Sequence, residues 1–385
     1  MGLALSVLCA SCVSQPTQQT LRFATFNAAM GLPAEGELAA RLAAGEDPAL
    51  HALAEVVQTV RPDVLLLNEF DYQDAVDAAA LLQGNYLSAA HGAAAPIEYP
   101  WAFSAAVNTG VDSGLDLDGN GIRGEAADAW GFGAFPGQYG MLVLSRYPLD
   151  AEAVRTFQGF LWQDLPGALQ PVHPGGEPFY PPATWAQLRL SSKSHWDVPL
   201  RIGGTTVHFL VSHPTPPVFD GAEDRNGKRN HDEIRFWADY VRGADYIYND
   251  AGAPGGLPEG ARFVLAGDQN ADPNDGDSYP GAIAQLLNHE EIDSRCIPRS
   301  AGGAEASALQ GGANLTQRGD PAADTADFSD RVTGNLRIDY VLASRTLTVL
   351  GCGVFWPATG AARQPLVGHS DHRLTWVDVA LPSEP

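Results

Sequence analysis

The sequence of 385 residues has little cysteine and few basic side chains. It contains 4 Cys, and its 23 Lys and Arg stand against 46 Asp and Glu. The formal net charge of -23 disfavours strong, sequence-independent binding of nucleic acid, because such binding depends on counterion release by Lys and Arg. A polynucleotide substrate is not excluded, since a bound divalent cation adds positive charge that a residue count omits.

Long hydrophobic runs are also missing, and beyond the first residues no segment is apolar enough to cross a membrane. The apolar residues 3–8 are followed by Ala10, Ser11 and Cys12. This start is similar to a bacterial lipoprotein signal, although no Lys or Arg precedes it and Cys9 stands three places before Cys12. We expect residues 1–20 to be a leader and linker of an exported protein, secreted or periplasmic. Membrane attachment through a lipidated Cys12 and a merely frayed N-terminus both stay open.

Export would leave Cys296 and Cys352 as the only other cysteines of the mature chain. An even number of cysteines in an oxidising compartment favours a disulfide bond, and two buried thiols are the alternative. The length fits one large domain or two medium ones, and we place a single domain at residues 21–381.

Polar side chains stand at the ends of apolar, strand-like runs. Residues 21–27 end at Asn27, residues 63–69 end at Glu69, and residues 262–268 end at Asp268. Helical spacing of apolar residues in 37–44 and 51–60 separates the first two runs. Strand alternation directs Asp268 and Asn270 to one side, where they could hold and deprotonate a water molecule. Turn chemistry at Asp268 and Asn270, and a solvated carboxylate at Glu69, are the alternatives.

Further strands are expected at residues 139–148, 184–190 and 205–213, and the last of these ends at His213. Near neutral pH this imidazole could donate a hydrogen bond to a phosphoryl oxygen or pass a proton to a leaving group, and a satisfied loop histidine is the alternative. Three stretches break the pattern and are interpreted as insertions, at about residues 94–137, 160–182 and 217–232.

The first insertion contains half of a calcium-loop pattern. Asp116, Asp118 and Asn120 alternate and Gly121 stands at the sharp turn, but Ala127 occupies the place of the bidentate carboxylate. We expect a structural Ca²⁺ that orders the insertion, with an acidic turn-rich loop as the alternative.

The third insertion is a basic island in an acidic chain. Arg225, Lys228 and Arg229 follow His213 closely and would suit a substrate phosphate. The island ends at Asp232 in what is interpreted as a helix cap, because apolar residues then repeat at helical spacing. A solvated loop in which Arg and Asp pair with each other is the alternative.

A carboxylate, Asp339, lies inside the apolar run of residues 335–343, where a charge is costly unless it is paired. His372 is the candidate partner, and residues 374–381 then form a final strand. A carboxylate that keeps an imidazole protonated places a cation over a pentavalent phosphorus. Asp371 would then lie beside Glu69 as an oxygen site for Mg²⁺.

Six motifs together resemble the endonuclease/exonuclease/phosphatase superfamily, which includes nucleases of the DNase I type, abasic-site endonucleases, neutral sphingomyelinases and inositol polyphosphate phosphatases. The resemblance covers residues 21–381 outside the insertions. It implies an α/β fold of four layers, with two mixed β-sheets packed face to face and helices outside. In order the motifs are Asn27, Leu67-Asn68-Glu69, His213, Gly267-Asp268-Gln269-Asn270, Arg337-Ile338-Asp339-Tyr340 and Ser370-Asp371-His372.

The resemblance also implies roles for these residues. Glu69 would be the main ligand of Mg²⁺ or Mn²⁺, with Asn27 and Asp371 nearby. Asp268 would activate the water, and Asn270 would hold water or phosphate. His372, held by Asp339, would stabilise the transition state. His213 would stabilise the phosphoryl oxygens or assist the leaving group. Asn27 would also contact the substrate. A second carboxylate that orients His213 in some members cannot be placed in this sequence.

We therefore expect an exported, monomeric, metal-dependent phosphodiesterase, of which an extracellular nuclease is one form. A phosphomonoesterase or a phospholipid-directed enzyme that scavenges phosphate is the runner-up. Substrates would be nucleic acids, nucleotides or lipid head groups, and no obligate protein partner is evident. An alternative from a different functional class is a non-catalytic surface binding protein ordered by Ca²⁺. The presence of all six motifs argues against it, because such a protein would not need a full hydrolytic set.

Overall fold

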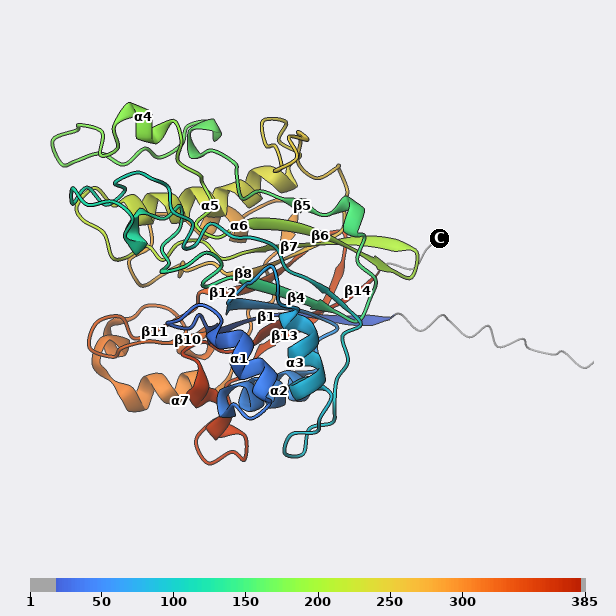
Figure 1. Ribbon diagram of the computed structural model, residues 1–385. Helices are drawn as coiled ribbons and strands as arrows, with labels where there is room; N and C mark the ends of the chain where they lie inside the picture. Colours follow the sequence, from blue (N-terminus) through green and yellow to red (C-terminus); the bar gives the residue numbers. More distant parts are fainter. Residues whose placement is uncertain (1–18, 382–385) are drawn as a thin grey trace, which may run out of the picture.

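Two six-stranded β-sheets form the centre of the molecule. The structure is a computed structural model and describes residues 19–381, so the expected leader with Cys12 lies outside the described residues (Figure 1). The first sheet has the order β13 (Thr348–Val354), β14 (Thr375–Ala380), β1 (Thr20–Met30), β2 (Val64–Phe70), β4 (Met141–Ser145) and β3 (Trp101–Phe103). The second has the order β5 (Arg155–Thr156), β6 (His195–Ile202), β7 (Thr205–Ser212), β8 (Phe263–Asp268), β12 (Asp339–Ser344) and β9 (Ile292–Asp293).

Helices lie outside the paired sheets, which confirms the expected four-layer α/β fold. In Figure 1, α1 to α3 lie below the first sheet and α5 lies above the second. The helices are α1 (Glu37–Ala44), α2 (Pro48–Val60), α3 (Ala78–Leu82), α4 (Pro182–Trp185), α5 (Arg225–Val241), α6 (Ala284–Leu287) and α7 (Ala301–Gln310). A two-stranded ribbon of β10 (Ala326–Asp327) and β11 (Asn335–Leu336) completes the described structure. No helix of residues 19–381 is long and apolar enough to span a bilayer.

The apolar strands are buried on both faces, which explains their unbroken hydrophobic runs. In β2, Leu66 packs between the two sheets, whereas Leu65 and Leu67 pack towards α2. In β8, Val264 faces the first sheet and Leu265 packs with the residues of α5. Strand alternation therefore builds three hydrophobic layers from the same short segments.

Both sheets are mixed. β1 pairs with β2 in parallel, and β7 pairs with β8 in parallel, so these strands end at the same edge of their sheets. β12 runs antiparallel to β8, and Asp339 at its start lies opposite Asp268 at the end of β8. The topology thus brings residues from distant parts of the sequence to one end of the paired sheets.

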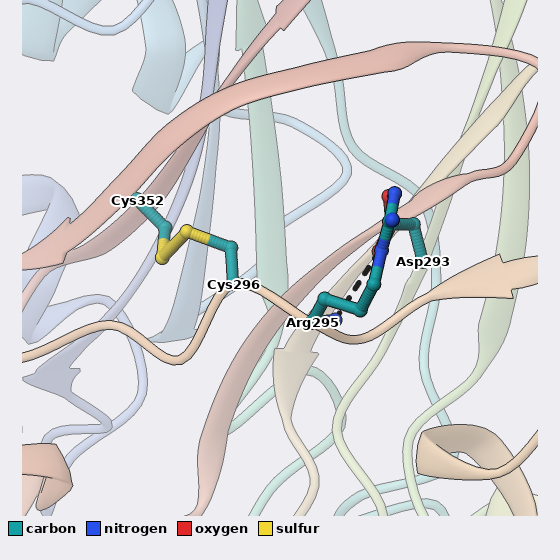
Figure 2. The surroundings of a disulfide bond; sticks show 4 residues. All are labelled: Asp293, Arg295, Cys296 and Cys352. Atoms are coloured by element: carbon teal, nitrogen blue, oxygen red, sulfur yellow. Dashed lines mark hydrogen bonds and ion pairs between the residues drawn. A yellow bond between two sulfur atoms is a disulfide. The ribbon is translucent and has the colours of Figure 1, made fainter.

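A disulfide bond between Cys296 and Cys352 confirms the expected pairing and excludes two free thiols. Cys352 belongs to β13, an edge strand of the first sheet, and Cys296 follows β9, an edge strand of the second. Figure 2 shows the bond beside the ion pair of Asp293 and Arg295, whose charged atoms approach to 2.5 Å. The crosslink therefore joins the two sheets at their margins.

The expected strand at residues 184–190 is wrong. Pro182 begins a short helix, since proline suits the first turn, and the chain then passes through turns. Leu188 and Leu190 are buried, and Arg189 between them forms only an isolated antiparallel bridge with Leu161, so the alternating apolar pattern reflects burial rather than a full strand. The true strand is β6, which the sequence analysis missed because Pro199 lies inside it and lacks an amide donor.

Two element boundaries also differ from expectation. Helix α5 begins at Arg225, within the basic island, and Asp232 is a buried residue of the helix rather than its cap. The polar character of its first half hid the helical pattern. Asp339 is the first residue of β12 rather than an interior one, because residues 337–338 separate β11 from β12.

Candidate active site

Asp268, the last residue of β8, is the centre of a buried polar cluster. Its Oδ2 accepts a hydrogen bond of 3.1 Å from Asn27 Nδ2 of β1. The Nε2 atoms of His213 and His372 lie 3.4 and 3.6 Å from the same oxygen. All four side chains are at least nine-tenths buried. Residues from positions 27 to 372 of the chain therefore converge on one carboxylate.

His372 is held by a second carboxylate, as the sequence analysis proposed. Its Nδ1 lies 2.9 Å from Oδ2 of Asp339, while its Nε2 faces Asp268. Burial by itself would lower the pKa of His372, but the negative charges of Asp339 and Asp268 outweigh it and raise the pKa above its ordinary value. The imidazole is therefore kept protonated at neutral pH.

Asp268 also has a perturbed acidity. Burial raises the pKa of its carboxyl group, and Asp339 raises it further, while the positive charge of His372 and the hydrogen bond from Asn27 act in the opposite direction. A carboxyl group whose pKa moves towards neutrality can accept a proton from water more readily than an ordinary aspartate.

Asn270 and Glu69 adopt a strained backbone conformation next to this cluster. Both have φ of 52°, in the left-handed region that residues other than glycine rarely use. The amide of Asn270 donates to Asp268 Oδ1 at 2.9 Å, and its Nδ2 donates to the carbonyl of Pro214 at 3.1 Å. Gly267 permits the turn, because a Cβ there would lie 2.0 Å from the carbonyl oxygen of Ser212.

Glu69 has a carboxylate that could serve as an oxygen donor for a divalent cation. It is half-buried, and its carboxylate makes no hydrogen bond or ion pair within residues 19–381. The preceding residue, Asn68, accepts from the amide of Asp268 at 3.2 Å, so Glu69 lies beside the cluster. The buried Oδ1 of Asp339 also lacks a partner in the described part of the chain. Unused carboxylate oxygens of this kind fit a hard cation such as Mg²⁺.

Asp371, a predicted Mg²⁺ ligand, differs from the buried residues of the Asp268 cluster in its exposure to solvent. It is exposed, whereas the next residue, His372, is buried. The amide oxygen of Asn27 accepts from the backbone of Ala29 at 3.1 Å and so has one lone pair engaged. Metal ligation by Asn27 and Asp371 stays a prediction.

His213 follows β7 and is held as a neutral imidazole. Burial lowers its pKa well below the ordinary value, and the positive charges of Lys193 and His372 lower it further. Its Nδ1 is buried without a hydrogen-bond partner among the described residues.

Sequence reasoning missed several residues that shape the site. Lys193, just before β6, is 6% exposed and lies within electrostatic range of Glu69 and Asp268. Asp71 accepts from the amides of Leu32 and Tyr139 at 2.9 Å each and so fixes the loop after Glu69. For Lys193 the sequence offered one signal, a lysine within the serine-rich segment of residues 191–194, which is buried in the structure. The sequence offered no signal for Asp71.

The three cations of the basic island have other tasks in this structure. Arg225 pairs with Glu223, and Lys228 Nζ donates to the carbonyl of Glu223 at 2.6 Å. Arg229 donates to four backbone carbonyls, including those of Leu190 and Trp130. These contacts hold the start of α5 to its neighbouring loops, and substrate binding by the three residues stays a prediction.

The acidic loop of the first insertion brings three carboxylates together. Ligand atoms of Asp116, Asp118 and Asp128 all lie within 4.8 Å of one another. Asn120, the third expected ligand, instead donates through Nδ2 to Asp118 at 3.0 Å and to Glu125 at 2.7 Å. Asp128 rather than Asn120 thus completes the acidic group, and calcium binding there stays a prediction.

Comparisons with known proteins show the family of this chain. A sequence model of the Endonuclease/Exonuclease/phosphatase family matches residues 24–372. The comparison with curated proteins gives no match. Among solved structures, an endonuclease/exonuclease/phosphatase from Beutenbergia cavernae is 18% identical with a TM-score of 0.52, over 96% of this chain and 73% of that chain.

Two other similar structures are a family protein from Leptotrichia buccalis and a beta toxin mutant from Staphylococcus aureus with bound magnesium ions. The first is 14% identical with a TM-score of 0.47, over 93% of this chain and 98% of that chain. The second is 13% identical with a TM-score of 0.48, over 94% of this chain and all of that chain (100%). The family match runs from β1 to His372 and so includes the whole Asp268 cluster. This chain belongs to the endonuclease/exonuclease/phosphatase family and is a hydrolase that acts on phosphoester bonds.

Proposed function

We propose that this protein is an exported, Mg²⁺- or Mn²⁺-dependent phosphodiesterase. The observation that carries the proposal is the convergence of Asn27, His213 and His372 on Asp268 Oδ2, with Glu69 free beside them. A buried base, a protonated imidazole and an unengaged carboxylate at one place are the groups that hydrolysis of a phosphate ester requires.

Each residue has a chemical task that follows from its surroundings. Asp268 accepts the proton of the attacking water, and Asn270 orients that water or a phosphoryl oxygen through its amide group. His372, kept protonated by Asp339, donates a hydrogen bond to the negative charge that develops on phosphorus oxygens.

The remaining tasks concern the leaving group and the cation. His213, kept neutral by burial, donates a hydrogen bond close to the leaving group. Glu69 would hold the divalent cation, with Asn27 and Asp371 as further ligands, and a bound cation would supply charge neutralisation for the phosphate.

Export is supported by the Cys296–Cys352 bond, because disulfides persist mainly in oxidising compartments. Lipidation of Cys12 and the monomeric state belong to the same proposal. A Ca²⁺ ion held by Asp116 and Asp118 would order the first insertion without taking part in hydrolysis.

The test compares wild type with Asp268→Asn and with Asp245→Asn, which makes the same change at an exposed residue after α5. The substrates are bis-p-nitrophenyl phosphate, p-nitrophenyl phosphate, DNA, RNA and sphingomyelin. We expect diester hydrolysis by wild type and by Asp245→Asn, silenced by EDTA and restored by Mg²⁺ or Mn²⁺. In Asp268→Asn, kcat should fall at least about 100-fold with an unchanged melting temperature, because the proton acceptor is lost.

Three outcomes would contradict the proposal. Full turnover in EDTA would exclude the metal requirement. Near-wild-type activity of Asp268→Asn would remove Asp268 from its role as base. Preference for p-nitrophenyl phosphate over the diester would favour the phosphomonoesterase alternative.

A further inference from the structure

Lys193 is an unusual cation in this protein. The sequence has only two lysines, at positions 193 and 228. Lys193 lies in the loop just before β6 and is 6% exposed, although lysine is almost never fully buried without a partner. Its ammonium group makes no hydrogen bond and no ion pair within residues 19–381. A mostly buried lysine whose ammonium group has no hydrogen-bond partner among the described residues is costly unless another molecule supplies an acceptor.

The loop that carries Lys193 is fixed against the Asp268 cluster. The hydroxyl of Ser192 donates to the carbonyl of His213 at 3.4 Å, which ties the loop to the end of β7. The carbonyl of Lys193 accepts from the amide of Asn108 at 2.8 Å, so the first insertion holds it from the other side. These two contacts hold the loop, and with it Lys193, beside His213, and neither of them involves the ammonium group of Lys193.

Glu233 does not serve as an ion-pair partner for Lys193. Its two carboxylate oxygens accept from the amides of Ser192 at 2.5 Å and Thr215 at 2.7 Å. Burial lowers the pKa of Lys193, while the negative charges of Glu233, Glu69 and Asp268 raise it. Burial is the larger effect, so the pKa of Lys193 lies below its ordinary value, and none of the three carboxylates forms an ion pair with the ammonium group within residues 19–381.

We propose that Lys193 binds a non-bridging oxygen of the substrate phosphate, as a positioning cation between Glu69 and His213. This inference rests on the proposed function and adds a residue to it. A preorganised ammonium group needs an anionic oxygen to complete its hydrogen bonds, and a phosphate ester held at Asp268 supplies one. The vacant donors of Lys193 thus define the phosphoryl-binding side of the site.

The test uses Lys193→Met, which keeps an unbranched side chain of similar size and removes its charge. Arg242→Met is the matched control, because it also removes one positive charge. Arg242 lines a surface hollow with Phe263, at the end of β8 opposite Asp268. We expect Lys193→Met to weaken binding of inorganic phosphate in the presence of Mg²⁺, measured by calorimetry, by about 10- to 100-fold. Diester kcat/KM should fall by a similar factor, and Arg242→Met should match wild type in both.

The melting temperature of Lys193→Met distinguishes a role of Lys193 in phosphate binding from a role in stabilising the fold. Because a buried ammonium without a partner is replaced by an apolar side chain, the melting temperature of Lys193→Met should equal or exceed that of wild type. A lower melting temperature together with unchanged phosphate binding would overturn the proposal, since Lys193 would then serve the fold alone.

The scarcity of lysine permits a second readout that does not depend on turnover. Protein labelled with ¹³C-lysine should give two Cε signals, assigned with Lys228→Arg. Inorganic phosphate with Mg²⁺ should shift the Lys193 signal, and a shift confined to Lys228 would overturn the proposal.

If wild type hydrolyses no phosphoester but phosphate still shifts the Lys193 signal, the proposed function fails and the binding inference stands. If wild type is active and Lys193→Met is equally active, the inference fails and the function stands.

Discussion

At the scale of single residues, the site depends on carboxylates in three different surroundings. Asp268 shares one oxygen with an amide and two imidazoles, and Asp339 is engaged by His372. Glu69 is left without a hydrogen-bond partner in the described chain. In the proposed mechanism the same functional group therefore has three roles, as base, as orienting anion and as metal ligand, because burial and neighbours differ.

Asp324 shows how strongly burial can raise the pKa of an aspartate in this acidic chain. Asp324 is 5% exposed, and its Oδ2 has no partner in the part of the chain that the structure describes. Burial, followed by the negative charges of Asp272, Asp275 and Asp320, raises its pKa from 3.8 to about 8. Between these two values the folded state keeps a proton that the unfolded chain has lost, so stability falls as pH rises and becomes constant above the folded pKa.

We predict that Asp324→Asn removes this loss of stability. The variant should match wild type at acidic pH and melt at a higher temperature than wild type at about pH 9, because its side chain does not ionise. Thermal unfolding measured from about pH 3 to pH 9 tests this, with Asp245→Asn as the exposed control. Parallel pH curves for Asp324→Asn and wild type would show that Asp324 does not titrate in this range.

At the scale of elements, strand pairing explains why the site residues meet. Parallel pairing of β1 with β2 and of β7 with β8 aligns the carboxyl ends that carry Asn27, Glu69, His213 and Asp268. The antiparallel register of β12 on β8 adds Asp339 opposite Asp268. Neither helix propensity nor local sequence could produce this arrangement, because the paired segments lie far apart in the chain.

The disulfide bond belongs to the same scale, because it joins edge strand β13 of the first sheet to the loop that follows edge strand β9 of the second. Cys296 and Cys352 are 56 positions apart, so the bond closes a long loop in the unfolded chain. We predict that replacing both cysteines by Ala lowers the free energy of unfolding by about 2–4 kcal/mol.

Urea unfolding of the oxidised protein and of the double variant measures the effect of the disulfide. Wild type unfolded in the presence of dithiothreitol should behave like the double variant. Coincident unfolding curves for oxidised and reduced wild type would contradict the prediction.

At the scale of the whole molecule, the net charge of -23 opposes approach of a polyanion. We predict that kcat/KM on duplex DNA rises when ionic strength increases from about 0.01 to about 0.15 M, because the Debye length shrinks from about 30 to about 8 Å. The small substrate bis-p-nitrophenyl phosphate should show a much weaker dependence. Steady-state kinetics at constant metal concentration measures both. A fall of kcat/KM on DNA with added salt would instead indicate a basic groove that the net charge conceals.

The sequence predicted the strands whose apolar runs end in a polar residue. It also predicted the group of Asn27, Asp268, Asp339 and His372, because buried runs and their terminal polar groups are local features. It failed at residues 184–190, where burial imitated strand alternation, and at β6, where Pro199 masked a paired strand. The helical first half of α5 was missed as well, because its buried polar residues are satisfied only by tertiary contacts.

What the sequence determined by itself is the chemistry available: acidic charge, strand-terminal carboxylates and imidazoles, and a pair of cysteines. Only the tertiary structure decided which of these groups meet. It turned the cations of the basic island towards carbonyls and a carboxylate of the protein, and it placed the loop of Lys193 beside His213 with no partner for its ammonium group among residues 19–381. The physical reason is that pairing register and burial, which set the distances and the pKa values, depend on segments hundreds of residues apart.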